Sequence, residues 1–344
     1  MKENNTPIVN NIQMENNTPW IEKYRPKKLS EIVSQEESIS ILNNTLKTGE
    51  LPHLLLYGPP GTGKTSSILA LCNELFGPIR VNERVIELNA SDDRGINVVR
   101  GKIINFAKIA IGTKDPRYLC PDYKIIILDE ADAMTKEAQA ALRKVMEENS
   151  NITRFCIICN YINQIIEPIN SRCVKIRFKP IDKINLINKL DWISSHENIK
   201  INKDALECIG DISNGDLRKS ILMLQNIKYI KNNDDVFYHI SKKDIYDICK
   251  YISNELMLKY INEIKNNDNI INVINVTKEI INNGYVFNSI MSKISNYIIY
   301  NNQINDKQKS KILFEISFIE KNINDGADEY IQLLKLMYII TTIK

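Results

Sequence analysis

The chain has 344 residues, of which 43% are hydrophobic and 25% are charged, a composition typical of a soluble globular protein with two or three domains. No apolar run approaches the length of a membrane span, and the N-terminus lacks the apolar core of a secretion signal, so we expect no membrane partner. The net charge is only +3, which means that any nucleic-acid-binding surface must be local. Several of the seven cysteines lie in apolar segments, which favours reduced thiols inside the cell.

The order of predicted elements indicates three domains after an unstructured start. Residues 1–18 are polar and Asn-rich without periodicity, and we expect them to form a disordered tail. Strand and helix patterns alternate through residues 19–180, which predicts an α/β domain with a parallel sheet flanked by helices. Residues 181–239 predict a small helical domain, and residues 240–344 predict an all-α domain. The strands are expected at 53–57, 84–88, 124–129 and 153–159.

A phosphate-binding loop follows the first predicted strand. Residues 58–65 read Gly-Pro-Pro-Gly-Thr-Gly-Lys-Thr, and they stand between an apolar strand and a helical pattern, as such a loop requires. The glycines let backbone N–H groups point at phosphate oxygens, and the helix N-terminus favours negative charge. We expect Lys64 to reach the β- and γ-phosphates and the Thr65 hydroxyl to ligate Mg²⁺. The residues expected to contact the nucleotide here are Gly58, Pro59, Pro60, Gly61, Thr62, Gly63, Lys64, Thr65 and Ser66.

Two acidic residues stand at the end of the strand predicted at 124–129: Asp129 is its last residue and Glu130 follows it. Ligands collect at the carboxyl ends of strands in an open α/β sheet, so these acids should meet the phosphates. Asp129 fits the carboxylate that holds Mg²⁺, and Glu130 fits the general base that orients or deprotonates the attacking water. A pair of solvated acids at a strand end is the alternative. Together with the phosphate loop, the pair predicts hydrolysis of a nucleoside triphosphate.

The succession of motifs points to a family. In chain order they are Pro-Trp-Ile-Glu-Lys-Tyr-Arg-Pro at 19–26, the phosphate loop, Glu-Leu-Asn-Ala-Ser-Asp-Asp-Arg-Gly at 87–95, Asp-Glu-Ala-Asp at 129–132, Ser-Arg-Cys at 171–173 and Gly-Asp-Leu-Arg at 215–218. This order resembles the small subunits of the replication factor C clamp loader, which are AAA+ ATPases. Within that family, Cys120-Pro121 and residues 153–161 look most like the eukaryotic subunit four.

The resemblance implies a fold and a function for the whole chain. It implies an AAA+ P-loop ATPase domain at 19–180, a helical lid at 181–239 and an oligomerising collar at 240–344. It also implies a heteropentamer with other replication factor C subunits, in the nucleus. Such a complex hydrolyses ATP to open a sliding clamp of the PCNA type and to load it on primer–template DNA during replication and repair.

The resemblance also assigns roles to three further residues. Asn160 falls at the sensor-1 position, where an amide bonds the γ-phosphate or the water, although an Asn at a strand end is commonly a turn former. Arg218 falls at the sensor-2 position, which reaches the bound nucleotide from the second domain. Arg172 corresponds to an arginine finger that enters the neighbouring subunit's site. The alternative for Arg172 is an ion pair with a local acid such as Glu167.

The base should be adenine. We expect it near Tyr24, Arg25, Pro26 and Val33, because an aromatic ring and a proline can pack on the base while backbone groups read its edge. No motif here reads guanine, which makes ATP the expected nucleotide.

Basic residues on two predicted helices form the expected DNA surface. The family lines a central spiral with these helices, so that side chains and helix N-termini meet duplex phosphates. Without interleaved aromatics, recognition should depend on shape and charge and not on base sequence. Solvated helix faces remain the alternative for each residue. The expected DNA contacts are Arg94, Arg100, Lys102, Arg143 and Lys144.

Two other classes of protein stay open on sequence alone. A different AAA+ motor would carry an aromatic pore loop or helicase motifs, and we find neither. A scaffold that binds ATP without hydrolysing it is disfavoured by the acidic pair but is not excluded.

Overall fold

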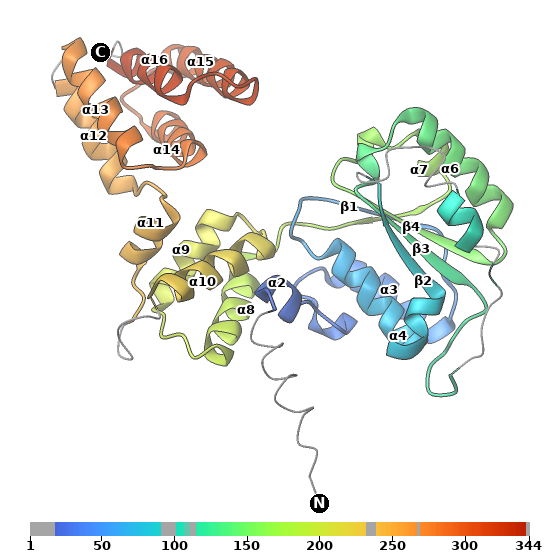
Figure 1. Ribbon diagram of the computed structural model, residues 1–344. Helices are drawn as coiled ribbons and strands as arrows, with labels where there is room; N and C mark the ends of the chain where they lie inside the picture. The colour runs from blue at the N-terminus through green and yellow to red at the C-terminus, as the bar shows by residue number, and fades with distance from the viewer. Residues whose placement is uncertain are drawn as a thin grey trace, which may run out of the picture. The chain divides into compact units, whose positions relative to one another are not determined.

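The computed structural model describes residues 18–90, 101–106, 109, 115–231, 239–266 and 269–341. The chain divides into two compact units (Figure 1): the described residues of 1–200 and 206–237 form the first, and those of 201–205 and 238–344 form the second. The disordered tail expected at 1–18 lies outside the described residues except for Thr18. Among the helices in the described ranges, none is long and apolar enough to span a membrane.

A five-stranded sheet forms the centre of the first unit. In space the strands follow the order β2-β3-β4-β1-β5, and every neighbouring pair is parallel. The loops that follow β1, β3 and β4 therefore open at the same edge, with the β4 exit between the other two. The strands are β1 (Leu54–Tyr57), β2 (Val85–Asn89), β3 (Lys124–Asp129), β4 (Thr153–Cys159) and β5 (Val174–Arg177).

Helices cover both faces of this sheet because the strands are apolar on both faces. Leu54 and Leu56 of β1 pack in one layer with α3 and α4, whereas Leu55 packs in the other layer with α6. Figure 1 shows α3 and α4 on one side of the sheet and α6 and α7 on the other. The helices of these layers are α3 (Glu36–Thr48), α4 (Lys64–Arg84), α6 (Lys136–Asn149) and α7 (Glu167–Asn170).

The predicted α/β architecture is confirmed, and the four expected strands are found at almost the expected positions. The edge strand β5 was not expected from the sequence. Within it Ile176 is buried but Val174, Lys175 and Arg177 are exposed, so it carries no continuous apolar run. Pairing with β1, and not its own composition, makes it a strand.

Shorter elements and a helical subdomain complete the first unit. The N-terminal helix α2 lies against α10, and the backbone N–H of Trp20 donates to Gln225 Oε1 at 3.2 Å. The short elements are α2 (Trp20–Lys23), η1 (Leu29–Glu31), η2 (Ala131–Ala133) and η3 (Ile162–Gln164). The helical subdomain contains α8 (Lys183–His196), α9 (Lys203–Ser213) and α10 (Leu217–Lys231), of which only the first residues of α9, up to Ala205, fall in the second unit.

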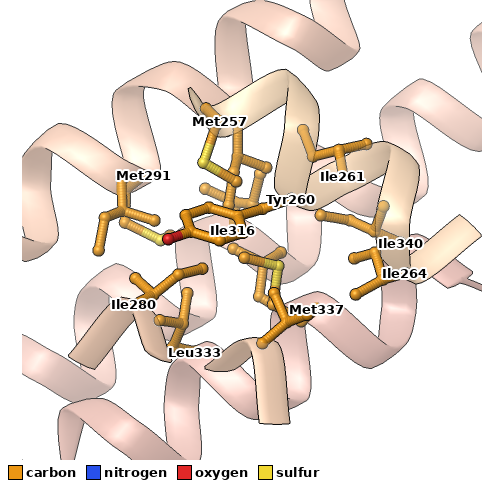
Figure 2. Close-up of a cluster of buried hydrophobic side chains, with 14 of the residues drawn as sticks. Met257, Tyr260, Ile261, Ile264, Ile280, Met291, Ile316, Leu333, Met337 and Ile340 are labelled. Atoms are coloured by element: carbon orange, nitrogen blue, oxygen red, sulfur yellow. The ribbon is translucent and has the colours of Figure 1, made fainter. Parts of the chain in front are cut away.

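The second unit is helical and has a core of its own. Figure 2 shows the ring of Tyr260 surrounded by the side chains of Met257, Met291 and Met337 and by isoleucines, all of which belong to one buried cluster. The Tyr260 hydroxyl donates to Glu279 Oε1 at 2.9 Å, so the polar end of this buried ring is satisfied. The helices are α11 (Lys242–Cys249), α12 (Asn254–Asn266), α13 (Ile270–Asn282), α14 (Phe287–Tyr300), α15 (Asp306–Asn324) and α16 (Glu329–Thr341).

Candidate nucleotide-binding and hydrolysis site

The phosphate loop joins β1 to α4, as the sequence predicts. Helix α4 begins at Lys64, so its first N–H groups and the positive end of its dipole face the loop. Lys64 is buried, and its Nζ donates to Gly58 O at 2.7 Å, to Pro59 O at 2.8 Å and to Asn160 Oδ1 at 3.0 Å. Burial lowers the pKa of Lys64, while the Asp129 carboxylate acts in the opposite direction. The ammonium group therefore lies at the centre of the loop.

Oxygen atoms suited to a magnesium ion meet beside the loop. The Thr65 hydroxyl donates to Asp129 Oδ2 at 2.7 Å, which brings the two expected metal ligands into direct contact. Hydroxyl and carboxylate oxygens are the donors that Mg²⁺ prefers, so this pair fits the ion. Glu130 follows in the left-handed conformation with φ 53°, and its carboxylate is exposed. For a residue other than glycine this conformation is strained, and such strain is typical of functional sites.

Asn160 lies between the loop and the acids because β4 lies between β1 and β3. Its amide oxygen contacts Lys64, as described above. Its position is fixed by Asp132, whose Oδ2 accepts the backbone N–H of Asn160 at 3.0 Å and that of Tyr161 at 3.2 Å. Asp132 therefore ties the turn that carries Glu130 to the end of β4. The sequence alone indicated no role for Asp132, although it lies in the Asp-Glu-Ala-Asp motif.

The helical subdomain contacts the loop at Gly61. The backbone N–H of Leu217 donates to Gly61 O at 3.2 Å, and a Cβ at Gly61 would lie 1.7 Å from Asp216 Oδ1. Gly61 also has a φ of 68°, so both its backbone and its neighbour require glycine. Asp216 Oδ1 accepts the Lys219 N–H at 3.0 Å in the first turn of α10. This contact places the exposed Arg218 at the loop.

A pocket opens beside the loop where adenine was expected. The residues expected to hold the base, Tyr24, Arg25, Pro26 and Val33, all line it. Arg218 lines it from α10, and Gly61, Thr62, Gly63 and Ser66 line it from the loop and the start of α4. The structure therefore brings the expected adenine residues, the phosphate loop and Arg218 together. The side chain of Arg25 also pairs with Glu22 at 3.2 Å.

Arg172 lies apart from this pocket, at the end of the α7 segment. Its guanidinium donates to Glu147 Oε1 at 2.5 Å and to Pro168 O at 2.7 Å. Glu147 also accepts from Arg143 Nε at 3.0 Å, and the hydrogen bond from Arg143, with a contribution from Arg172, lowers the pKa of Glu147. An ion pair with a local acid is therefore present, but its partner is Glu147 and not Glu167.

The residues expected to contact DNA are only partly within the described structure. Arg94 and Arg100 lie outside the described residues. Lys102 is exposed on the helical stretch 101–106, and Lys144 is exposed on α6. Arg143 is half-buried on α6 and is held by Glu147.

Three family models match the chain in succession. The model of the ATPase family associated with various cellular activities matches residues 54–181. The model described as the RCF1/5-like, AAA+ ATPase lid domain matches residues 188–229, and the replication factor C C-terminal domain matches residues 238–338. The RuvB Holliday junction branch migration motor of Thermotoga maritima has a similar fold, with a TM-score of 0.51 and 19% identity over 70% of this chain and 79% of that one. Fold and site together define an AAA+ ATPase.

Similar proteins of known name match nearly the whole chain. Replication factor C subunit 4 of Homo sapiens is 45% identical over 92% of this chain and 86% of its own length. Subunit 4 of Arabidopsis thaliana is 43% identical over 93% and 94%, and subunit 2 of Saccharomyces cerevisiae is 41% identical over 93% and 91%. The chain therefore belongs to the replication factor C small subunits, the AAA+ clamp-loader ATPases of DNA replication.

Proposed function

We propose that this chain binds ATP with Mg²⁺ and hydrolyses it as one subunit of a heteropentameric clamp loader. With its partner subunits it opens a sliding clamp of the PCNA type and loads it on primer–template DNA during replication and repair in the nucleus. The observation that carries the proposal is the meeting of Lys64, the Thr65–Asp129 pair and Asn160 at one edge of the sheet, with Arg218 at the pocket beside them. Family membership supports the assembly and its partners.

The arrangement supports a division of labour among the site residues. The loop N–H groups and Lys64 bind the β- and γ-phosphates, and Tyr24, Arg25, Pro26 and Val33 bind the adenine. Glu130 accepts a proton from the attacking water, and Asn160 orients that water or the γ-phosphate. Thr65 and Asp129 would hold Mg²⁺, which neutralises charge on the phosphate oxygens when bound. Arg218 contacts the phosphates from the lid.

Arg172 is the proposed arginine finger for the neighbouring subunit's site. Its guanidinium is exposed at the surface of the first unit, where a neighbour's phosphates can reach it. The contact with Glu147 is an exposed ion pair, and such pairs contribute little because water and salt screen them. It is therefore weak enough to exchange for a γ-phosphate. A guanidinium there neutralises charge that develops in the transition state.

Duplex DNA is proposed to contact the basic residues Lys102, Arg143 and Lys144, together with Arg94 and Arg100 beyond the described residues. Lys102 and Lys144 are exposed, which supports contacts to phosphates. Such contacts bind every sequence equally and weaken as salt rises.

The test measures ATP turnover by the assembled complex with primed DNA and clamp, with Glu130 intact or replaced by Gln. Glu130→Gln keeps the size of the side chain but removes the base, so ATP should still bind while turnover at this site falls by about 10²-fold or more. To isolate this site, the partner subunits carry Gln at their own catalytic glutamates. Equal turnover with and without Glu130 would identify a scaffold that binds ATP without hydrolysing it.

A further inference from the structure

A buried carboxylate, that of Glu197, connects the motif at residues 19–26 to the lid. Glu197 follows the last residue of α8, and its side chain is only 8% exposed. Its Oε1 accepts from Lys23 Nζ at 2.5 Å and from the Tyr24 hydroxyl at 2.6 Å, and its Oε2 accepts from Lys228 Nζ at 2.7 Å. Residues from the end of α2, the end of α8 and the middle of α10 therefore meet at one group. All of them belong to the first unit.

The donors around Glu197 stabilise the ionised form of its carboxylate. Burial alone would raise the pKa of Glu197, but the hydrogen bonds from Lys228, Lys23 and Tyr24 outweigh it and hold the pKa at about 2. A carboxylate that accepts several donors in this way stays charged at neutral pH. The same burial and the contact with Glu197 raise the pKa of Tyr24, whose hydroxyl remains a donor. At the pH of the cell the Glu197 carboxylate is therefore ionised and the Tyr24 hydroxyl is protonated, as their hydrogen bond requires.

Aromatic rings hold Tyr24 from two sides. Trp20 packs edge-to-face against Tyr24 with centroids 6.1 Å apart, and Trp192 of α8 does the same at 5.7 Å. Lys228 Nζ also lies 5.2 Å from the centroid of the Trp20 ring. Such geometries are favourable for aromatic pairs and for a cation over an indole. The ring of Tyr24 thus packs against one lid residue, Trp192, and against Trp20 of α2, in addition to the hydrogen bond of its hydroxyl to Glu197.

The same segment also lines the pocket that is proposed to bind adenine. Tyr24, Arg25 and Pro26 line the pocket together with Leu217 and Arg218 of the lid. Consecutive Cα atoms are about 3.8 Å apart, so a fixed Tyr24 leaves the next two residues little freedom. Pro26 further restricts the backbone of Arg25 to extended conformations. This wall of the pocket is therefore anchored to the lid, although in the sequence it lies near the start of the ATPase domain, 19–180, far from residues 181–239.

We propose that Glu197 is a positioning residue that anchors the adenine wall, Tyr24 to Pro26, to the lid. Adenine binding is then coupled to the placement of Arg218 at the phosphates, since the adenine wall and Arg218 both move with the lid. The inference rests on the proposed function, because it requires that the pocket binds ATP. Loss of Glu197 weakens binding of the base and leaves binding of the phosphates nearly unchanged.

The experiment measures affinity in the assembled complex, with the phosphate-loop lysines of the partner subunits replaced so that only this pocket binds. Two ligands are compared, Mg·ATP and Mg·tripolyphosphate, each displacing a ribose-labelled ATP. For Glu197→Ala we expect ATP affinity to fall about tenfold, ~1.4 kcal/mol, with tripolyphosphate affinity within about twofold of wild type. KM for ATP should rise by the same factor while kcat at saturating ATP changes little.

Two further variants separate positioning from folding. Glu197→Gln keeps an acceptor oxygen for the Tyr24 hydroxyl and should restore part of the lost ATP affinity. Tyr24→Phe keeps the ring, changes the fold least and should weaken ATP binding about threefold. Combined with Glu197→Ala it should add nothing, because Glu197→Ala already removes the hydrogen bond between the Tyr24 hydroxyl and Glu197. Asp191→Ala removes an exposed carboxylate from the same helix and serves as the matched control with unchanged affinity.

Each outcome decides a different question. Equal loss of ATP and tripolyphosphate affinity in Glu197→Ala would mean that Glu197 merely supports the lid, and unchanged ATP affinity in both Glu197→Ala and Tyr24→Phe would remove any role in binding. Either result overturns the inference. A wild-type complex that fails to bind ATP at this pocket would instead refute the proposed function.

Discussion

Replacing Gly61 by alanine should separate the lid from the phosphate loop. A Cβ at Gly61 would lie 1.7 Å from Asp216 Oδ1 and 2.3 Å from Asp216 Cγ, and the residue has a φ of 68°. The left-handed conformation costs an alanine about 1–2 kcal/mol. Relief of the clash requires Asp216 to move, which disturbs its bond from the Lys219 N–H and the bond from the Leu217 N–H to Gly61 O.

The magnitude follows from these two bonds. Each contributes about 1 kcal/mol; the Lys219 bond lies within the lid and is lost if the Asp216 side chain turns away, and the Leu217 bond joins lid to loop and is lost if the lid moves. Relief of the clash therefore costs about 1–2 kcal/mol beyond the backbone strain. ATP affinity in Gly61→Ala should therefore fall by at least about tenfold, measured by equilibrium binding to the assembled complex. The double variant Gly61→Ala with Asp216→Gly removes the clash and should recover part of that loss.

A control isolates backbone strain from the clash. Gly284 also has a positive φ, of 70°, but a Cβ there would meet nothing within 4 Å. Gly284→Ala should lower the thermal stability of the chain and leave ATP affinity unchanged. Wild-type ATP affinity in Gly61→Ala, or a double variant no better than the single one, would refute a role for this contact between lid and loop in ATP binding.

Three further predictions concern other parts of the first unit. Arg172→Ala should leave ATP binding at this pocket intact and lower kcat at the neighbouring site by about 10³–10⁵-fold; additive loss on combination with that neighbour's catalytic glutamate variant would refute the finger. Joint replacement of Lys102 and Lys144 by Ala should reduce the salt dependence of DNA binding by about two counterions, and an unchanged slope would exclude this face. Glu197→Gln should destabilise the chain to urea by about 1–3 kcal/mol at pH 7. Because the folded pKa of Glu197 is depressed from 4.5 to about 2, this difference should shrink as pH falls through that interval, and a pH-independent difference would contradict it.

The sequence predicts where the candidate site residues lie because the motifs that carry them are local. The phosphate loop, the acidic pair and the strands before them are each encoded in a few consecutive residues, and the structure brings Lys64, Thr65, Asp129 and Asn160 into contact as expected. Their assembly depends on parallel strands that end at one edge, a rule that needs no knowledge of distant contacts.

The features that the sequence did not predict depend on contacts between distant residues. Glu197 lies 173 residues from Tyr24 and belongs to no motif, so its pairing could not be read from spacing. Asp216 was visible in the Gly-Asp-Leu-Arg motif, but its contact with Gly61 depends on how the lid packs. The partner of Arg172 was expected nearby in sequence, at Glu167, whereas the fold places Glu147 of α6 beside it. Such choices among acids are made by tertiary packing.

The affinity of the assembled complex for Mg·ATP, with Lys64 intact or replaced by Ala, tests the central claim most directly. Lys64 Nζ lies at the centre of the loop, and its loss removes a charge-assisted contact to the terminal phosphates. With the partner sites silenced, Lys64→Ala should lower ATP affinity at least about tenfold, near 1.4 kcal/mol. Unchanged binding would contradict the assignment of this loop as the phosphate site, and with it the proposed ATPase activity of the chain.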